Sequence, residues 1–194
     1  MTGTHLAPGA HGAHLAAAPT PDAAERRAVV IVTSTRAAAG VYADRTGPVI
    51  AEWLDDHGFA GAAVAVGGRD FAPGEPVVVA DGPAVGAALR AALDAGVQLI
   101  VTTGGTGVGA GDVTADATAE LLTAPLPGFS EELRRRGSVV TPFALMSRGV
   151  AGVAGRTFIV NLPGSTGGVR DGLQLLGEVI DHVLDQLAGG GHDA

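Results

Sequence analysis

Short, unbroken apolar runs alternate along the chain with segments in which apolar residues recur every three or four positions. The first run extends from Ala28 to Val32 and ends at Thr33 without a polar interruption. A run of this length is typical of a strand buried on both faces, as in a parallel sheet. Comparable runs predict further strands at 62–66, 77–80, 99–101, 150–153 and 157–162.

The segments between these runs predict helices. The strongest pattern extends from Val169 to Leu187, where apolar residues keep a helical spacing over about 19 residues before a run of glycines. Apolar residues at 85, 89 and 93 predict another helix, and Pro83 suits its first turn. Shorter helices are predicted at 48–54, with His57 at the C-terminal end, at 129–137 and at 142–147. The alternation of strands and helices predicts an α/β protein, a three-layer α/β/α sandwich with a mostly parallel central sheet.

We expect a single domain over residues 27–188, because 194 residues suffice for one α/β core. Residues 1–26 are rich in Ala, Gly, Pro, Thr and His and predict a disordered tail, and residues 189–194 a short C-terminal tail. Residues 67–76 are expected to form a turn or a surface insertion. No apolar run approaches the roughly 20 residues of a membrane span, and no secretory signal is evident, so we expect a cytoplasmic protein without a membrane partner.

Composition excludes several kinds of chemistry. The chain has no cysteine, which removes disulfides, zinc–thiolate sites and thiol nucleophiles. Its net charge of −8 argues against nucleic acid as a partner, because no extended basic patch is present to neutralise phosphates. The dense basic cluster Arg134–Arg136 follows Glu131 and Glu132, which predicts an ion-paired, solvated helix face. A phosphate-facing role for one of these arginines is the alternative.

The stretch from Leu99 to Thr118 is the richest in candidate chemistry. A predicted buried strand is followed by five glycines within eight residues, and then by Asp112, Thr114 and Asp116. These polar residues predict a helix start with capping side-chain oxygens. A loop without Cβ atoms lets backbone N–H groups approach a bound group closely, and a helix N-terminus favours an anion. We therefore expect a phosphate-bearing ligand at this loop.

Asp81 and Asp112 each follow a predicted strand, and a single predicted helix separates the two strands. Because ligands of parallel sheets bind beyond the carboxyl ends of the strands, both acids are expected at one edge, with the loop at 161–164 beside them. Paired carboxylates next to a glycine loop suit Mg²⁺-assisted work on phosphates. On position alone, an N-cap or turn carboxylate explains Asp81 equally well.

Two common nucleotide-binding loops are absent. A Walker A loop requires lysine, and the chain contains none. The dinucleotide fingerprint that would start at Gly105 and Gly107 needs glycine where Ala110 stands. The sequence also lacks a G-x-S-x-G elbow, and Ser147, beside Arg148, is a single serine that a structural role explains. If a substrate phosphate is the nucleophile, positioning and electrostatics suffice for catalysis.

Five segments, in order along the chain, resemble one known family. The central segment reads TTGGTG at 102–107, followed by DVT at 112–114 and DAT at 116–118. It resembles the signature of the molybdenum-cofactor biosynthesis proteins of the MoaB/Mog type, and the resemblance covers essentially residues 27–188. The supporting segments are Ala38–Asp44, Pro127–Glu131, Leu145–Arg148 and Asn161–Ser165.

The resemblance implies the three-layer fold, usually as a homotrimer, and molybdopterin adenylyltransferase activity. Such enzymes use Mg-ATP to adenylate the terminal phosphate of molybdopterin and release pyrophosphate, so it implies molybdopterin and ATP as substrates, Mg²⁺ as cofactor and a molybdenum insertase as a further partner. It gives catalytic and Mg²⁺-binding roles to Asp81 and Asp112, and a pterin-side role to Ser147. The residues implied to hold nucleotide and pterin phosphates are Thr103, Gly104, Gly105, Thr106, Gly107, Asn161, Pro163, Gly164 and Ser165.

Two positions depart from the family pattern. Many members carry a cation immediately before the acid matched by Asp112 and a proline after the Asp-Val-Thr, whereas this chain has Gly111 and Ala115. Loss of a cation beside a phosphate removes on the order of 1–3 kcal/mol of charge-assisted hydrogen bonding. Either another arginine compensates, or ATP turnover is weaker. A non-catalytic molybdopterin-binding or assembly protein is therefore the alternative, and a nucleotide-binding regulator a third hypothesis.

Overall fold

The computed structural model of the protein describes residues 26–189, so the tails predicted at 1–26 and 189–194 lie outside the described residues except for Arg26 and Gly189. The strands in this range are β1 (Arg27–Thr33), β2 (Ala60–Gly61), β3 (Val64–Val66), β4 (Arg69–Phe71), β5 (Val77–Val79), β6 (Leu99–Thr103), β7 (Ala124–Pro125), β8 (Ala151–Ala154) and β9 (Thr157–Leu162). Seven of them form one sheet of order β2-β1-β6-β9-β8-β7, with β5 also beside β1. β1, β2, β5, β6 and β9 run in parallel, whereas β8 and β7 run antiparallel to their neighbours.

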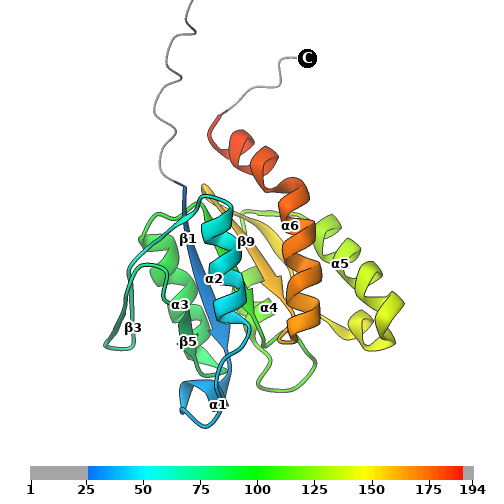
Figure 1. Ribbon diagram of the computed structural model, residues 1–194, viewed down its shortest axis with the longest axis horizontal. Helices are drawn as coiled ribbons and strands as arrows, with labels where there is room; N and C mark the ends of the chain where they lie inside the picture. Colours follow the sequence, from blue (N-terminus) through cyan, green and yellow to red (C-terminus); the bar gives the residue numbers. More distant parts are fainter. Residues whose placement is uncertain (1–25, 190–194) are drawn as a thin grey trace, which may run out of the picture.

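Helices cover both faces of this sheet. They are α1 (Thr35–Ala38), α2 (Gly47–Asp56), α3 (Pro83–Asp94), α4 (Thr114–Ala119), α5 (Pro127–Val140), the 3₁₀ helix η1 (Pro142–Met146) and α6 (Thr166–Leu187). Figure 1 shows α2 and α6 in front of the sheet, α5 beside α6, and α3 and α4 behind. The predicted three-layer α/β/α sandwich with a mostly parallel central sheet is confirmed.

The unbroken apolar run of β1 has a direct structural cause, because its side chains enter two cores. Val30 packs with Ile50 and Leu176 beneath α2 and α6, whereas Ile31 points to the opposite face and packs with Leu89 of α3. Successive side chains of a strand point to opposite faces, so a strand covered on both sides needs apolar residues throughout. Full burial of each such side chain contributes roughly 1.5–3 kcal/mol. The sheet therefore holds the carboxyl ends of its strands at fixed positions.

The strand predicted at 62–66 is wrong in extent. The chain leaves the main sheet after Gly61, and Val64–Val66 pairs instead with Arg69–Phe71 in a separate hairpin. Gly67 and Gly68 form its turn with φ values of 60° and 79°, a conformation that favours glycine and matches the twist of paired strands. The insertion predicted at 67–76 thus contains a strand, and its Phe71 is buried against the core under α3.

The other strand and helix predictions are confirmed to within a few residues. His57 caps the C-terminal end of α2, as predicted, and its ring stacks on Trp53 at a centroid distance of 3.8 Å. The elements α1 and β7 were not predicted, because four and two residues are too few to show a periodic pattern. Over residues 26–189, no helix is both long enough and apolar enough to cross a bilayer.

Candidate functional site

The carboxyl ends of β1, β5, β6 and β9 meet at one edge of the sheet, which is the lower edge in Figure 1. Backbone hydrogen bonds join the segments that follow these strands: the Ser34 amide donates to the Val79 carbonyl at 2.9 Å, and the Gly104 amide donates to the Leu162 carbonyl at 3.2 Å. The structure therefore brings the glycine loop, Asp81 and the 161–165 loop to the same edge, as predicted.

The first two glycines of the loop are required by close packing. Gly104 and Gly105 have φ values of 88° and 60°, which other residues rarely adopt. A Cβ atom on Gly104 would collide with the carbonyl of Thr33, and one on Gly105 would collide with the hydroxyl of Thr114. The Thr114 amide also donates to the Gly105 carbonyl at 3.1 Å. The loop thus folds back against the end of β1 before α4 begins.

Arg148 fixes the far side of the glycine loop. Its backbone amide donates to the Thr106 carbonyl at 2.8 Å and its Nε to the Gly107 carbonyl at 2.7 Å. One terminal nitrogen donates to the Asp112 carbonyl, and the other pairs with both carboxylate oxygens of Asp116 at 2.9–3.0 Å. One guanidinium therefore ties together the loop from Thr106 to Asp116.

Asp112 is not a helix cap. α4 begins at Thr114, its N-cap residue is Val113, and no side chain caps it, so the predicted capping oxygens are wrong. The Asp112 carboxylate turns back into the loop instead, where Oδ2 accepts a hydrogen bond from the Gly109 amide at 2.8 Å. Its position against Gly107 leaves no room for a side chain there. Asp112 thus lies within the glycine loop, half-buried.

Asp81 connects two strand ends. Its Oδ2 accepts hydrogen bonds from the amide and hydroxyl of Thr35 at 3.0 and 2.6 Å, and the Thr35 hydroxyl is 3.2 Å from the Asp81 amide. The N-cap alternative for Asp81 is wrong, because Gly82 is the N-cap residue of α3 and no side chain caps that helix. Asp81 therefore secures the start of α1, whose next residue is Arg36.

Gly111 joins the two acids: it directly precedes Asp112, and a Cβ on it would lie 3.8 Å from Cβ of Asp81. Among the hydrogen bonds of the described residues, Asp81 and Asp112 each use Oδ2 and leave Oδ1 without a protein donor. No group of three or more acidic or histidine side chains spaced for a metal occurs in residues 26–189. A hard cation would here rest on two carboxylates, and substrate oxygens would complete its coordination.

In the 161–165 loop most side chains serve the fold. Asn161 is buried; its Nδ2 donates to the hydroxyls of Thr102 and Thr118 at 2.9 Å, and its Oδ1 accepts from the Val150 amide at 3.1 Å. The Thr103 hydroxyl donates to the Pro163 carbonyl at 2.9 Å. These bonds fix the loop, and what they leave exposed to a ligand is backbone and the Ser165 side chain.

A polar pocket of about 330 Å³ opens beside α1, and we call it the arginine pocket. It is framed by Arg36 and Arg45, whose guanidinium groups lie 5.7 and 5.9 Å from the centre of the Tyr42 ring. Its floor is formed by the ends of β1 and β6 and the start of α6. The predicted residues that line it are Thr103, Gly104, Gly164 and Ser165.

A larger pocket of about 480 Å³ lies between the glycine loop and α5–η1, and we call it the apolar pocket. Leu133, Val140, Phe143 and Met146 give it an apolar wall. Arg134 also lines it, but its Nη1 donates to the carbonyls of Ser147 and Gly149 at 3.2 Å. The predicted residues that line it are Thr106, Gly107, Ser147, Asn161, Pro163 and Ser165.

Ser165 lines both pockets, so they meet at the start of α6. The acids and Gly105 are not among the lining residues, but the acids lie next to them. Asp81 is bonded to Thr35, between Ser34 and Arg36 of the arginine pocket, and Asp112 lies against Gly107 of the apolar pocket. The structure thus places one acid next to each pocket and the two acids next to each other.

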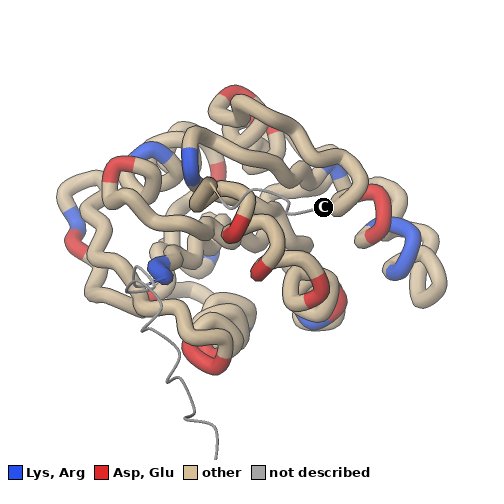
Figure 2. Tube along the Cα trace, turned by 90° about the horizontal axis from the view of Figure 1, so that it is seen from above, with Lys and Arg blue, Asp and Glu red and all other residues tan. Residues whose placement is uncertain are grey.

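The three arginines of α5, Arg134–Arg136, have two kinds of partner. Arg135 and Arg136 both pair with Glu132, and Arg136 reaches Glu178 on α6, so the prediction of an ion-paired face is confirmed for these two. Figure 2 shows the acidic and basic positions of α5 following one another along the trace at the right. Arg134 differs, because it turns towards the apolar pocket. The bonds from Arg135 and Arg136 lower the pKa of Glu132 from 4.5 to about 2, and Arg136 also lowers the pKa of Glu178.

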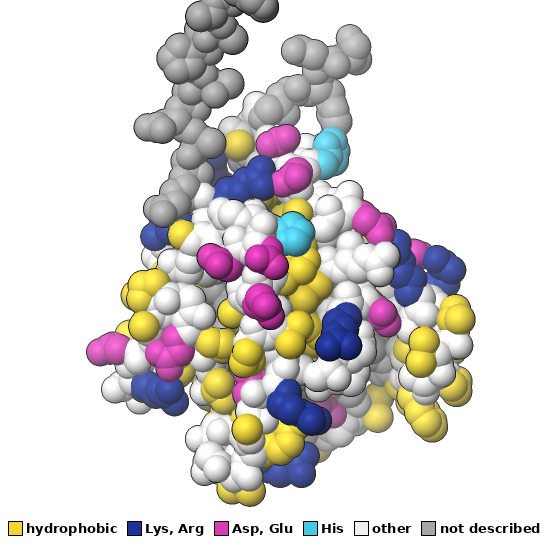
Figure 3. Space-filling model, viewed as in Figure 1, with side chains coloured by type: hydrophobic (Ala, Val, Ile, Leu, Met, Phe, Trp, Pro, Cys, Tyr) yellow, Lys and Arg dark blue, Asp and Glu magenta, His cyan; other side chains and the backbone are white. Residues whose placement is uncertain are grey.

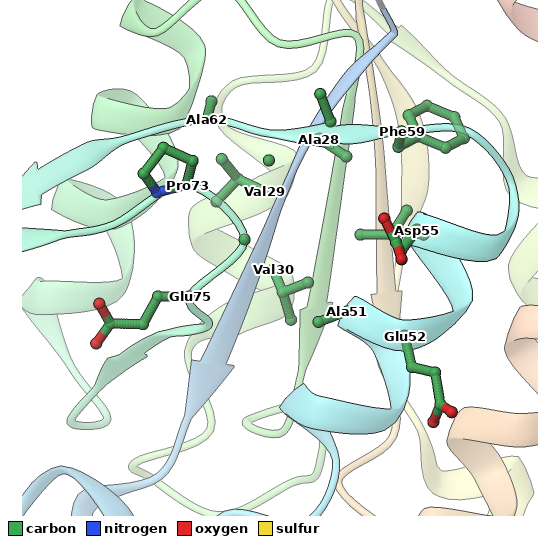
Figure 4. A pocket seen from close by; sticks show the side chains of 14 residues that line it. Ala28, Val29, Val30, Ala51, Glu52, Asp55, Phe59, Ala62, Pro73 and Glu75 are labelled. Carbon is green, nitrogen blue, oxygen red and sulfur yellow. The ribbon is translucent and has the colours of Figure 1, made fainter.

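A third hollow, of about 370 Å³, lies at the amino end of β1 and contains no predicted site residue. It is bordered by β1, α2 and the segment around Glu75. Figure 4 shows that the carboxylates of Glu52 and Glu75 point away from one another. Glu75 is held by Arg69 at 3.0 Å. The acids of this hollow do not converge, so we place the candidate site at the carboxyl edge.

Sequence reasoning missed Arg36 and Arg45, and it noted Arg148 only as a neighbour of Ser147. The available signal was the segment from Ala38 to Asp44, because Arg45 follows it directly and Arg36 lies two residues before it. The role of Arg148 leaves no local signal, because its partners lie 32 to 41 residues away along the chain.

Several known proteins are similar to this chain in sequence and fold. Residues 29–182 match the family described as "Probable molybdopterin binding domain". The Mog protein of molybdopterin biosynthesis from Mycobacterium ulcerans is 49% identical with a TM-score of 0.75, over 84% of this chain and 99% of that one. The molybdopterin adenylyltransferase of Helicobacter pylori (strain J99) is 30% identical over 164 residues, covering 82% of this chain and 86% of that protein. A molybdenum cofactor biosynthesis bifunctional protein from Chlorobaculum tepidum is 39% identical over 166 residues, 86% of this chain but 50% of the relative.

The fold and the site define an α/β sandwich with a glycine loop and two acids at the carboxyl edge of a parallel sheet. The chain belongs to the molybdopterin-binding family of molybdenum cofactor biosynthesis proteins, and the MoaB/Mog resemblance is confirmed. It spans about half the length of the bifunctional relatives that it matches. Its role lies in molybdenum cofactor biosynthesis.

Proposed function

We propose that this protein is a molybdopterin adenylyltransferase, which transfers the AMP moiety of Mg-ATP to the terminal phosphate of molybdopterin. The observation that carries the proposal is the meeting of two unlike pockets at Ser165, with Asp81 and Asp112 beside them. One pocket has the shape and apolar wall that a flat heterocycle needs, and the other offers cations. Relatives named molybdopterin adenylyltransferase support the same activity.

The reaction needs a nucleophile that the substrate itself supplies. An oxygen of the pterin phosphate attacks the α-phosphorus of ATP, the bond from that phosphorus to the β-phosphate oxygen breaks, and pyrophosphate leaves with the electron pair. No side chain forms a covalent bond, so the protein contributes orientation and electrostatics. A cysteine-free chain without a serine elbow suits this chemistry.

The chain's own groups have distinct tasks in this reaction. Asp81 and Asp112 lie beside the two pockets and would hold Mg²⁺ there with their Oδ1 atoms, which have no protein donor among the described residues. Bound Mg²⁺ would offset the charge of the phosphate oxygens. The glycine loop brings backbone close to the phosphates, and Arg148 keeps the Asp112 carbonyl and therefore its side chain in place.

The pterin ring is assigned to the apolar pocket. Leu133, Phe143 and Met146 can cover its faces, and Ser147 and the nearby backbone can bond its polar edge. Arg134 holds the carbonyls of Ser147 and Gly149 and so fixes this wall. The terminal phosphate of the pterin would then point towards Ser165 and the acids.

A direct assay tests the proposal. The protein is incubated with molybdopterin, ATP and Mg²⁺, and adenylated molybdopterin and pyrophosphate are quantified in equal amounts. We expect both products with the wild-type chain and neither without Mg²⁺. Tight pterin binding without any ATP-dependent product would instead favour a non-catalytic binding or assembly protein. ATP binding that molybdopterin does not influence would favour a nucleotide-binding regulator.

We also propose that the chain forms a homotrimer. The end of α5 and η1 expose a cluster of large apolar side chains, seen as yellow surface at the lower right of Figure 3. Exposed clusters of this kind mark contact surfaces between proteins. Light scattering should give three times the monomer mass, and Val139→Glu should lower the measured mass. A molybdenum insertase, which would accept the adenylated pterin, is proposed as a separate partner, and a pull-down with that enzyme tests it. The exposed residues are Val139, Val140, Phe143, Leu145 and Met146, of which Val139 and Leu145 do not line the apolar pocket and would form the subunit contact.

A further inference from the structure

The arginine pocket contains two cations that form no ion pair with any of the described residues. All twelve basic side chains of the chain are arginines, and the protein as a whole has a net charge of −8. Within residues 26–189, Arg36 and Arg45 form no ion pair and no hydrogen bond, and each only faces the ring of Tyr42. Basic side chains gather at the lower tip of the molecule around α1 in Figure 3.

The acid that lines this pocket forms no ion pair with either arginine among the described residues. Asp44 also lines the pocket, but its two oxygens accept hydrogen bonds from the amides of Thr46 and Gly47 and from the Thr46 hydroxyl at 2.9–3.2 Å. These bonds fix the start of α2 and aim the carboxylate at the backbone. Both guanidinium groups line the same pocket beside one ring in an acidic protein, and a bound anion would offset their charge.

The backbone contributes to the same pocket. The 22-residue helix α6 starts at Thr166, and its first residues line the pocket with Gly104 and Gly164. Ser165 already caps the Gly168 amide at 3.2 Å, so the helix start is ordered before any ligand binds. The partial positive charge of this terminus adds to that of the two guanidinium groups.

We infer that Arg36 and Arg45 bind the β- and γ-phosphates of the nucleoside triphosphate, and that this pocket receives the pyrophosphate leaving group. The inference rests on the proposed function. Three features favour a polyphosphate over the single phosphate of the pterin: two guanidinium groups from separate segments, a volume of about 330 Å³, and few apolar walls. When the bond from the α-phosphorus breaks, the electron pair stays on the departing pyrophosphate, whose charge the two arginines stabilise.

The same geometry connects the pocket to the metal position. Asp81 bonds Thr35, the residue before Arg36, with Oδ2, so its carboxylate lies next to residues that line the pocket. A cation held there would contact the phosphates that Arg36 and Arg45 bind. This arrangement supplies the positive charge that Gly111 does not provide before Asp112. The missing cation of the glycine loop is thus offset from the opposite side of the site.

The test measures pyrophosphate binding by calorimetry and, separately, the KM of ATP and the affinity for molybdopterin. Arg36→Ala and Arg45→Ala should each weaken pyrophosphate binding and raise the KM of ATP by about ten-fold, because each removes a charge-assisted contact. The double variant should lose pyrophosphate binding altogether, while molybdopterin affinity changes less than about two-fold. Arg156→Ala, which removes an exposed charge at the turn between β8 and β9, is the matched control and should change neither.

The outcomes separate the inference from the proposed function. Loss of pyrophosphate binding with molybdopterin binding intact supports the inference, even if no adenylated product forms and the proposed function fails. Loss of molybdopterin binding with pyrophosphate binding intact would assign the pocket to the pterin phosphate and overturn the inference. A wild-type chain that binds no pyrophosphate, or variants that turn over ATP normally, would overturn it as well. The double variant Arg36→Lys/Arg45→Lys keeps both charges but lacks the planar guanidinium with its paired donors. It should recover part of the affinity for pyrophosphate, which would exclude misfolding as the cause of the loss in the alanine variants.

Discussion

The arginine pocket and the apolar pocket face the same sheet edge but hold their arginines in opposite ways. In the apolar pocket Arg134 donates hydrogen bonds to the carbonyls of Ser147 and Gly149. Nearby Arg148 donates hydrogen bonds to the glycine loop and to Asp116. In the arginine pocket Arg36 and Arg45 have no such partners among the described residues. Arg134 and Arg148 therefore stabilise the structure around the apolar pocket, whereas Arg36 and Arg45 are available to a ligand.

This difference shows how one edge can serve two unlike ligands. The apolar pocket is lined by side chains of α5 and η1 and would select its ligand by shape. The arginine pocket is lined by two arginines and by strand and helix ends, and would select its ligand by charge. Asp81 and Asp112 lie where the two regions adjoin. If this division is correct, variants on the two sides should change the kinetics of different substrates.

The largest effect is expected from the acids, which both sides share. Asp112→Asn keeps the size of the side chain, and its amide oxygen can still accept from the Gly109 amide, but the anionic ligand for Mg²⁺ is lost. We expect adenylation to fall on the order of a hundred-fold or more, with a thermal midpoint within about 2 °C of wild type. Asp81→Asn should behave alike. The measurement is kcat at saturating ATP and Mg²⁺, beside a thermal melt.

Asp70→Asn, on the exposed β4 strand, removes the same charge away from the edge and should leave the rate unchanged. Wild-type rates in both Asp112→Asn and Asp81→Asn would remove the acids from the site. A rate loss that only parallels a loss of stability would make them structural residues.

Arg148 should give the next largest effect. Arg148→Ala releases the carbonyls of Gly107 and Asp112 together, so Asp112 loses its fixed position, and we expect kcat to fall roughly ten- to a hundred-fold. Asp116→Asn removes only the exposed ion pair, which is worth little, and should cost less than about three-fold. Arg134→Ala should instead raise the KM of molybdopterin. Equal effects of Arg134→Ala and Arg148→Ala on both substrates would contradict the division between the pockets.

The fold was largely predictable because its signals are local and repeated. Ala28–Val32 and the stripe of α6 each show a single period over many residues, and both are confirmed. The segment 62–66 was mistaken because a strand of the main sheet and a strand of a hairpin have the same apolar composition. Gly67-Gly68 was the available hairpin signal in the sequence. The burial of Phe71, which completes the hairpin, is revealed only by the tertiary structure.

The candidate site was predictable as a location but not as a set of contacts. Parallel strands bring their ends to one edge, so Asp81, Asp112 and the 161–165 loop could be placed together from the sequence. That Asp81 bonds Thr35 across 46 residues, and that Asn161 is committed to Thr102 and Thr118, could not be read from spacing. Whether the predicted residues bind substrates stays a prediction for the variants above.

A smaller effect on the pterin side is expected from Ser147. Its hydroxyl accepts only a 3.3 Å hydrogen bond from the Gly149 amide, so it is weakly engaged and available to a ligand. Ser147→Ala should raise the KM of molybdopterin by about three- to ten-fold, the loss of one hydrogen bond, and leave the KM of ATP unchanged. Ser138→Ala on the outer face of α5 is the control. A rise in the KM of ATP would place Ser147 with the nucleotide instead.

The smallest effect concerns the ion pairs that Glu132 forms with Arg135 and Arg136 within α5, the helix that forms one wall of the apolar pocket. Arg135 and Arg136 lower the pKa of Glu132 from 4.5 to about 2, so this stabilisation is complete above pH 4.5 and is lost as the pH falls towards 2. Glu132→Gln should therefore lower the thermal midpoint slightly at pH 7, by about 2 °C or less because the pairs are exposed, and should match wild type near pH 2. Glu131→Gln, at a carboxylate without an ion pair in the described residues, should follow the wild-type pH profile throughout. Parallel profiles for wild type and Glu132→Gln would show that α5 is held by Leu133 and its apolar neighbours alone, and the shape of the apolar pocket would then be independent of pH.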